Sequence, residues 1–365
     1  MSVTYSILGI LKKLVFSACT NSTPTDGDVW YDSLGLWFRR GSNSRNLTGQ
    51  WETKVVKGSV GSAGLTGQSC SLLSKTSSNV IGLGDQTNVI RYSGTAATIT
   101  AHGATGNANM TLGARSGGTV IIQTAGNSVW RYSTDHGATW NNTSGGTTGL
   151  SGGVMCPGGA NGSSTTWIYA TGTSGSVVYK STNDGQSWSS VSSAYATNLL
   201  SAGIANNGSF GGSQVWILIS TTGIVRQSTD DGATWAAATT MGNLSAGTGK
   251  FINYINGYFV ALDNTGGGLI YYSPNTSTAW TSFKSPSMSQ SAGIFYDNGM
   301  YIFIDTSGVI YTCPDITASS PDWSIPCKAP SVNQYCEVVP FSGKYYTMDT
   351  LGSSNLGSVL FQYIP

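Results

Sequence analysis

Four aspartates occupy one recurring place in the chain, where a short apolar strand ends and a turn begins. They are Asp85, Asp263, Asp305 and Asp349. Carboxylates gathered at one face could bind a polar ligand such as a sugar, hold a divalent cation, or form the acid/base pair of a glycosidase. Each aspartate could instead start its turn by accepting a hydrogen bond from the backbone two residues further on. The turn role is favoured, and the ligand role stays open.

Three further polar residues fall in the links between the repeat units. Tyr195, Gln334 and Tyr335 carry rings and an amide that can stack on a sugar and hydrogen-bond to it. The chain contains only two histidines, His102 and His136, so neither a zinc cluster nor a Ser-His-Asp triad is indicated. We therefore predict a shallow polar ligand site made by these three residues and the four aspartates. We expect no catalytic residue, no metal and no cofactor.

A repeated strand pattern positions these residues. An apolar pair, one or two further residues and then Ser or a substitute recur seven times, about 40 to 50 residues apart. A second apolar strand and a turn precede each copy, a strand of small residues lies further upstream, and a strand that opens with Trp often follows. This order predicts one four-stranded blade per unit. The copies end at Ser93, Ser133, Ser181, Ser228, Ser273, Cys313 and Tyr363.

Three units continue into a longer motif of the form Ser-x-Asp-x-Gly-x-Ser/Thr-Trp, in which Asn once replaces Asp. The Ser and Asp side chains can bond the nearby backbone, Gly can take the left-handed conformation, and Trp can pack between outer strands. We therefore assign the motif to folding and not to ligand binding. Its residues are Ser133, Asp135, Gly137, Trp140, Ser181, Asn183, Gly185, Trp188, Ser228, Asp230, Gly232 and Trp235.

The motif resembles the Asp-box, also called the BNR repeat, of sialidases and other β-propellers. The resemblance implies a propeller whose motifs lie at the blade periphery, away from any active centre. It does not extend to the sialidase site, which uses three arginines, a Tyr nucleophile activated by Glu, and an Asp acid. The chain has only two glutamates, Glu52 and Glu337, and lacks the Arg-Ile-Pro signature. We expect a propeller that is not an enzyme.

The two ends of the chain complete each other. The seventh unit stops without its Trp-led outer strand, and residues 49–56, with Trp51, read as such a strand. Joining the ends would remove the open edges of a linear array. We therefore predict an all-β fold with a closed propeller of seven four-stranded blades over residues 49–365. Six blades with a separate terminal hairpin, or eight with one copy missed, are the alternatives.

Residues 1–48 differ from the repeats. Residues 5–16 fit a short amphipathic helix or a buried strand. Trp30 and Tyr31, then Trp37 and Phe38, alternate on the two sides of a turn, as in a hairpin. This stretch resembles a short module of tail-fibre, head-fibre and baseplate-associated proteins of tailed bacteriophages. The resemblance implies that these four aromatic residues belong to a virion anchor and that the propeller is the exposed head.

The composition excludes several classes of partner. Charged residues make up 9% of the chain, the net charge is +1, and no basic run is present, so nucleic acid is not expected. No apolar stretch approaches the ~20 residues of a membrane span, so membrane insertion is not expected. The six cysteines show no regular framework and are interpreted as free buried thiols.

The sequence thus predicts a non-enzymatic structural protein of a tailed-phage virion, as a fibre, spike or decoration protein that displays its propeller for attachment to a host-surface glycan. The expected partners are other virion proteins, through the N-terminal segment, and that glycan; self-association is left open. The expected location is the virion surface, after assembly in the host cytoplasm. The alternatives are a glycan-degrading depolymerase or glycosidase, and a cellular Asp-box propeller that acts in assembly or binding.

Overall fold

The computed structural model describes 25 stretches of the chain. It separates two compact units, residues 1–50 with 363–365, and residues 51–362. The described residues are 29–32, 35–40, 43–46, 50–55, 72–83, 88–103, 107–115, 117–125, 130–145, 153–159, 165–171, 177–191, 201–208, 214–220, 222–238, 241, 251–262, 269–275, 278–284, 291–297, 299–305, 309–319, 321–328, 339–350 and 358–364.

The first unit contains a three-stranded antiparallel sheet of β1 (Val29–Asp32), β2 (Gly35–Arg40) and β3 (Asn43–Asn46). Trp30 is opposite Trp37 in the register of β1 and β2. β1 and β2 thus pair as adjacent antiparallel strands. The segment expected to be a helix or a buried strand, residues 5–16, lies outside the described residues.

The second unit is built from four-stranded sheets, and six of them consist of strands that are consecutive in the chain. We number them as blades 1 to 6. Blade 1 is β5 (Leu72–Lys75), β6 (Val80–Leu83), β7 (Asn88–Tyr92) and β8 (Ala97–Ala101). Blade 2 is β9 (Asn107–Ala114), β10 (Val120–Ala125), β11 (Arg131–Ser133) and β12 (Asn141–Asn142). Blade 3 is β13 (Gly153–Pro157), β14 (Trp167–Thr171), β15 (Val178–Ser181) and β16 (Ser189–Ser190).

The other three blades follow the same plan. Blade 4 is β17 (Ser201–Asn206), β18 (Trp216–Ser220), β19 (Val225–Ser228) and β20 (Ala236–Ala237). Blade 5 is β21 (Phe251–Ile255), β22 (Tyr258–Leu262), β23 (Leu269–Ser273) and β24 (Thr281–Lys284). Blade 6 is β25 (Ser291–Asp297), β26 (Met300–Asp305), β27 (Val309–Cys313) and β28 (Ser324–Lys328).

One further sheet combines the two ends of the chain. Its strands, in order, are β29 (Val339–Phe341), β30 (Lys344–Thr350), β31 (Ser358–Ile364) and β4 (Gln50–Val55). The strand expected from residues 49–56 thus lies beside the last strand of the chain. Seven blades were predicted, and six consist of consecutive strands. The seventh repeat provides only three strands, and its outer neighbour comes from the other end of the chain. We call this seventh sheet the composite sheet.

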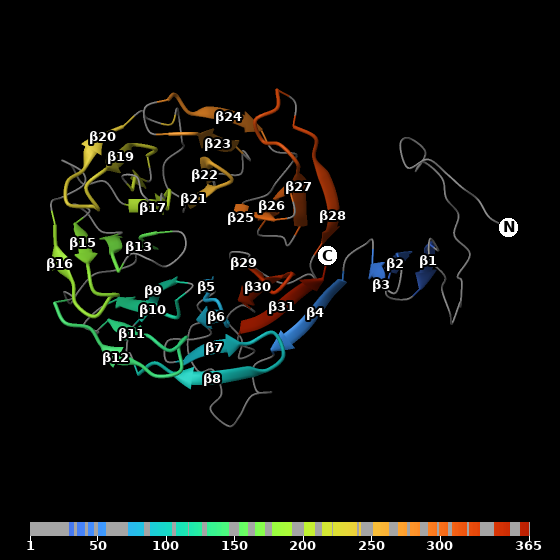
Figure 1. Cartoon of the computed structure of the whole chain (residues 1–365), viewed down its shortest axis with the longest axis horizontal. Helices are drawn as coiled ribbons and strands as arrows, with labels where there is room; N and C mark the ends of the chain where they lie inside the picture. Colours follow the sequence, from blue (N-terminus) through green and yellow to red (C-terminus); the bar gives the residue numbers. More distant parts are fainter. Residues whose placement is uncertain are drawn as a thin grey trace. The chain divides into compact units, whose positions relative to one another are not determined.

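Each blade buries both faces of its second strand against its neighbours. Every residue of β14 and of β18 is buried, and these strands read as unbroken apolar runs because both faces lie within the core. The first strands of successive blades contact one another, as β13 contacts β17 and β17 contacts β21. Figure 1 shows these first strands on the inner side of the sheets and the fourth strands on the outer side.

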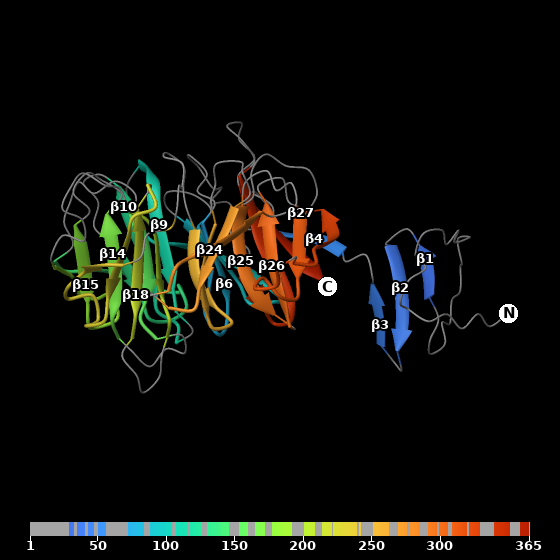
Figure 2. The same cartoon turned by 90° about the horizontal axis from the view of Figure 1, so that it is seen from above.

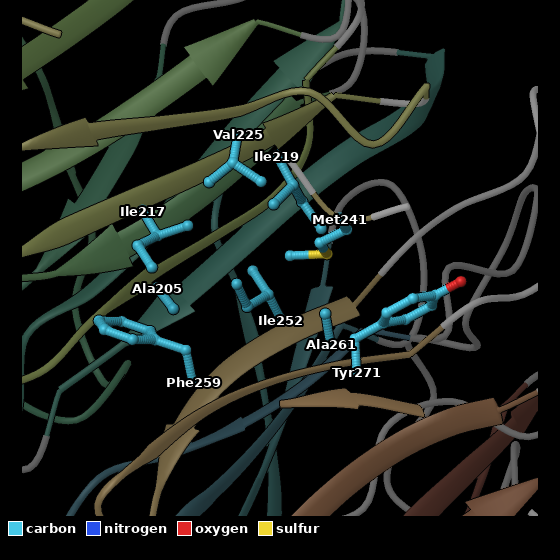
Figure 3. Close-up of a cluster of buried hydrophobic side chains, with 9 residues drawn as sticks. All are labelled: Ala205, Ile217, Ile219, Val225, Met241, Ile252, Phe259, Ala261 and Tyr271. Atoms are coloured by element: carbon cyan, nitrogen blue, oxygen red, sulfur yellow. The ribbon is translucent and has the colours of Figure 1, made fainter. Parts of the chain in front are cut away.

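The hydrophobic core is therefore divided into clusters that lie between blades. Between blades 4 and 5, Ile217 and Ile219 of β18 pack with Phe259 and Ala261 of β22 and with the Met241 side chain of the link (Figure 3). Small and branched side chains on the facing sheets fill such a layer without voids.

The strands run between two faces of the unit, as the turned view shows (Figure 2). Because the strands of a blade alternate in direction, the turn after its first strand and the turn after its third strand lie at the same end. In blade 2 these turns are bonded directly, since the amide of His136 donates to the carbonyl of Gly118 at 2.9 Å. We call this end the Asp-box face and the other end the link face.

Candidate functional site

The predicted ligand residues were expected together on the link face. The structure describes the side chain of only one of them, Asp305. The backbone of Asp349 lies in β30, but its side chain is outside the described part. The remaining predicted ligand residues lie outside the described residues: Asp85, Asp263, Tyr195, Gln334 and Tyr335.

Asp305 ends β26 and is bonded within its own hairpin. Its side chain is 2% exposed; Oδ1 accepts the amide of Val309 at 2.9 Å and Oδ2 accepts the hydroxyl of Tyr311 at 3.2 Å. Burial, followed by the adjacent Asp305 charge and this hydrogen bond, raises the pKa of Tyr311 to about 12. A carboxylate held in this way organises the turn and is not presented to a ligand.

The equivalent position of blade 4 performs the same task with a hydroxyl. Ser220 ends β18, and its Oγ accepts the amide of Ile224 at 3.0 Å, four residues further on, as Asp305 does with Val309. A carboxylate is therefore not needed for this turn, only an acceptor of the right reach. This favours a structural role for Asp305 in its turn.

The three turns that carry the Ser-x-Asp-x-Gly-x-Ser/Thr-Trp motif, which we label Asp-box turns by that sequence alone, share one hydrogen-bond pattern. The Ser hydroxyl accepts the amide of the Gly four residues on: Ser133 from Gly137 at 2.8 Å, Ser181 from Gly185 at 2.9 Å, and Ser228 from Gly232 at 2.8 Å. The third residue of the motif accepts the amide before the Trp, and Asn183 does this for Ser187 at 2.9 Å. An amide oxygen therefore replaces the carboxylate without loss of this bond.

Hydrogen bonds lower the pKa values of the two Asp-box aspartates, Asp135 and Asp230. In Asp135, burial by itself would raise the pKa, but hydrogen bonds from Thr139, Ser133 and Ala138 outweigh it and lower the pKa to about 2. Asp230 behaves alike, because bonds from Thr234 and Ser228 hold its pKa at about 2. The ionised form is therefore the one that the folded turn stabilises.

The sequence analysis missed the residue just before the Asp-box Gly. His136, Asp184 and Asp231 have φ of 59°, 58° and 56°, so two successive residues of the turn are left-handed. His136 also reaches the preceding blade, where its Nδ1 lies 2.9 Å from Thr76 Oγ1 and its carbonyl accepts Arg91 Nε at 2.8 Å. The sequence does carry a signal for this conformation, because the residue before the motif Gly is His or Asp in all three turns, and these residue types tolerate positive φ.

Asp184 makes the corresponding contact one blade later. Its Oδ1 pairs with Arg115, which follows β9 in blade 2 and is 5% exposed, and it also accepts Trp167 Nε1 at 3.3 Å. The Arg115 guanidinium lies 5.8 Å from the centre of the Trp167 ring. The motif thus links each of these blades to the preceding one.

The Asp-box tryptophans differ in burial. Trp188 is 4% exposed, donates from Nε1 to the Gly185 carbonyl at 3.0 Å and meets Trp130 of blade 2 edge-on at 4.8 Å. Trp140 and Trp235 are half-buried. Only Trp188 among the three is a core residue.

The arginines of the second unit have separate partners. Arg91 bonds the carbonyl of His136, Arg131 Nη2 bonds the carbonyl of Gly103 at 2.6 Å, and Arg115 pairs with Asp184. These partners lie at different places in the fold, so Arg91, Arg115 and Arg131 do not converge on one carboxylate-binding point. Cys156 and Cys313 are free thiols.

The described residues lack two kinds of feature. In those stretches, no group of three or more His, Cys, Asp or Glu side chains is placed to hold a metal ion. The same stretches contain no helix of the length and hydrophobicity needed to cross a membrane.

Comparison with known proteins identifies the fold. YCF48 bound to a peptide superimposes with a TM-score of 0.58 at 11% identity, over 87% of this chain and 95% of that chain. The WD40 β-propeller domain of Doa1 gives a TM-score of 0.56 at 12% identity, over 85% and 96%. The chain is a β-propeller. The GH74 enzyme of Niastella koreensis gives 0.54 at 21% identity, over 90% of this chain and 46% of that one.

At sequence identities this low, similarity to a solved structure shows the fold but not the function. No family model and no curated protein matches the chain. The function of this propeller must therefore be argued from its own residues.

Proposed function

We propose that this chain is a non-enzymatic structural protein of a tailed-phage virion, which displays its propeller for attachment to a host-surface glycan. One observation carries the non-enzymatic part: the described side chains best suited to chemistry are bonded inside folding contacts. Asp305 closes a hairpin, Asp135 and Asp230 stabilise Asp-box turns, and Arg115 pairs with Asp184. None of these groups is held ready to transfer a proton or attack a substrate.

The N-terminal unit is proposed to be the anchor, as residues 1–48 ahead of a propeller domain of residues 49–365. Its support is the compact sheet of β1, β2 and β3, which carries Trp30, Tyr31, Trp37 and Phe38 in its first two strands. A small unit with its own sheet can attach to other virion proteins while the propeller remains accessible.

We further propose that the composite sheet is a seventh blade that closes the ring, and that the three turns are Asp-boxes of the propeller family that bears them. Val339 and Tyr346 of the composite sheet share a core cluster with Val80, Ile90 and Tyr92 of blade 1, and β29 contacts β25 on its other side. These contacts support closure, because they bring the composite sheet against both of its proposed neighbours.

The location is tested by immunogold electron microscopy with antibodies against residues 51–362 on purified particles. We expect gold on intact particles, and its loss when the gene is replaced by a version that lacks residues 1–48. Full-length chain found only in the host lysate, with unlabelled particles, would contradict the virion assignment.

The non-enzymatic part needs a separate assay. Purified full chain is incubated with host surface polysaccharide, and the polysaccharide is analysed by size-exclusion chromatography. We expect an unchanged elution profile. Shortened chains would establish the depolymerase alternative.

A further inference from the structure

Tyrosines gather on the Asp-box face between blades 5 and 6. Tyr258 begins β22, Tyr272 lies near the end of β23, and Tyr296 and Tyr301 flank the turn between β25 and β26. Tyr301 is 1% exposed, whereas the other three are half-buried. We call these four residues, with Asn256, the tyrosine face.

The rings of this face are held in fixed positions. Tyr258 meets Tyr272 edge-on at 5.7 Å, and Tyr296 meets Tyr301 at 4.8 Å. The exposed Asn256 donates from Nδ2 to the Tyr301 hydroxyl at 3.0 Å, which joins the blade 5 turn to blade 6. Burial raises the pKa of Tyr301, and the hydrogen bond from Asn256 acts in the opposite direction.

The next junction repeats this arrangement with a carboxylate. Asp297, beside Tyr296, accepts the hydroxyl of Tyr345 of β30 at 2.8 Å, and Phe295 meets the Tyr345 ring at 4.8 Å. At both junctions the hydroxyl of a buried tyrosine bonds a polar side chain of the preceding blade, Asn256 or Asp297. The half-buried rings lie at the first junction, whereas Phe295 and Tyr345 at the second are buried, so the Asn256 amide is the polar group positioned beside half-buried aromatic surface.

Three successive sheets have similar tight turns at this end. Asn256 and Gly257 have φ of 48° and 85°, Ser342 and Gly343 have 52° and 71°, and Gly299 has 80°. Paired positive φ values are typical of two-residue hairpins, which hold the flanking strand residues in a fixed register. Half-buried tyrosines therefore lie beside such turns on two neighbouring sheets, those of blades 5 and 6, and this suits a ligand that itself repeats.

We propose that the tyrosine face binds a neutral polysaccharide. Half-buried rings offer apolar surface to the C–H faces of sugar rings, while the exposed Asn256 amide can bond a sugar hydroxyl. A chain of net charge +1 with 9% charged residues has little field to attract a polyanion or a polycation, so a neutral polymer is the matching partner. The inference rests on the proposed glycan attachment but assigns it to the face opposite the one predicted from the sequence.

The test is affinity electrophoresis of the full chain in native gels that contain dextran, galactomannan or hydroxyethyl cellulose, with alginate as the anionic comparison. We expect retardation in at least one neutral gel and none in alginate. The Tyr258→Ala, Tyr296→Ala double variant should bind about 10-fold more weakly, from the loss of two stacking rings. The matched control is Tyr132→Ala, a half-buried tyrosine of blade 2, which should bind as the original chain does.

A second variant keeps the test decisive if the double variant fails to fold. Asn256→Ala changes an exposed side chain and should also weaken the retardation. If the folded Asn256→Ala variant and the folded double variant are both fully retarded, the tyrosine face is not the binding site. That result would not contradict the proposed glycan attachment. No retardation in any neutral gel, or retardation in alginate alone, would overturn the neutral-polysaccharide site, while particle labelling would still report on the virion role.

Discussion

Gly185 lies where the Asp-box of blade 3 meets blade 2, and its replacement by Ala should be costly for two separable reasons. Its φ is 78°, which costs an L-residue roughly 1 to 2 kcal/mol. A Cβ at this place would also overlap Ile121 of β10, which is 0% exposed and cannot move into solvent. Forcing an extra carbon into a packed core adds about 1 to 3 kcal/mol.

Gly299 provides the matched control. Its φ is 80°, but a Cβ there would meet nothing within 4 Å. Both variants lose the same flexibility in the unfolded chain, so this contribution cancels in the comparison. Gly299→Ala should therefore show only the backbone cost, and Gly185→Ala should be less stable by a further ~1 to 3 kcal/mol.

The assay is urea unfolding of the full chain, followed by tryptophan fluorescence and far-UV circular dichroism. The two probes should give coincident transitions if a free energy of unfolding is to be compared. Equal destabilisation by the two substitutions would refute the claim that Gly185 is required by close packing between blades 2 and 3.

Three further predictions concern the same unit. Trp188→Ala should lower the free energy of unfolding by about 3 to 5 kcal/mol and the half-buried Trp235→Ala by clearly less, as measured by urea unfolding; equal losses would contradict the difference in burial. The pKa values of Asp135 and Asp230 are about 2 when folded against 3.8 ordinarily, so their contribution to stability is complete above about pH 4 and is lost as the pH falls toward 2. The melting temperature should therefore fall less steeply between pH 5 and pH 2 in the double Asp→Asn variant than in the original chain. Identical pH dependence in the two proteins would argue against these hydrogen bonds. Deletion of Gln50–Val55 should expose an edge of the composite sheet, and this should lower the melting temperature and promote aggregation, measured by light scattering. An unchanged melting temperature would show that this strand is dispensable.

The parts of the structure that sequence predicts well are local. The hydrogen bonds from Ser181 and Asn183 span at most four residues, so residue types at fixed spacing are enough to anticipate them. The pairing of Arg115 with Asp184 joins residues 69 positions apart, and nothing in either local pattern indicates the partner. Contacts between blades depend on how the sheets are arranged, which periodicity does not specify.

The candidate ligand site was harder to predict for a related reason. Asp305 was correctly placed at the start of a turn, but whether its carboxylate faces solvent depends on Tyr311 and on the neighbouring blades. The tyrosine face went unnoticed because Tyr258 and Tyr296 occupy strand ends in two different repeats, where aromatic residues read simply as strand formers.

The composite sheet has a consequence for synthesis on the ribosome. Its first-made strand, Gln50–Val55, must wait for Ser358–Ile364, which is translated about 300 residues later. At ~5 to 20 residues per second this is a delay of roughly 15 to 60 s. During that interval blades 1 to 6 can form as each is completed, while β4 keeps an unpaired edge. The composite sheet is thus assembled only after Ser358–Ile364 has been made, and a product truncated before this strand cannot complete the sheet.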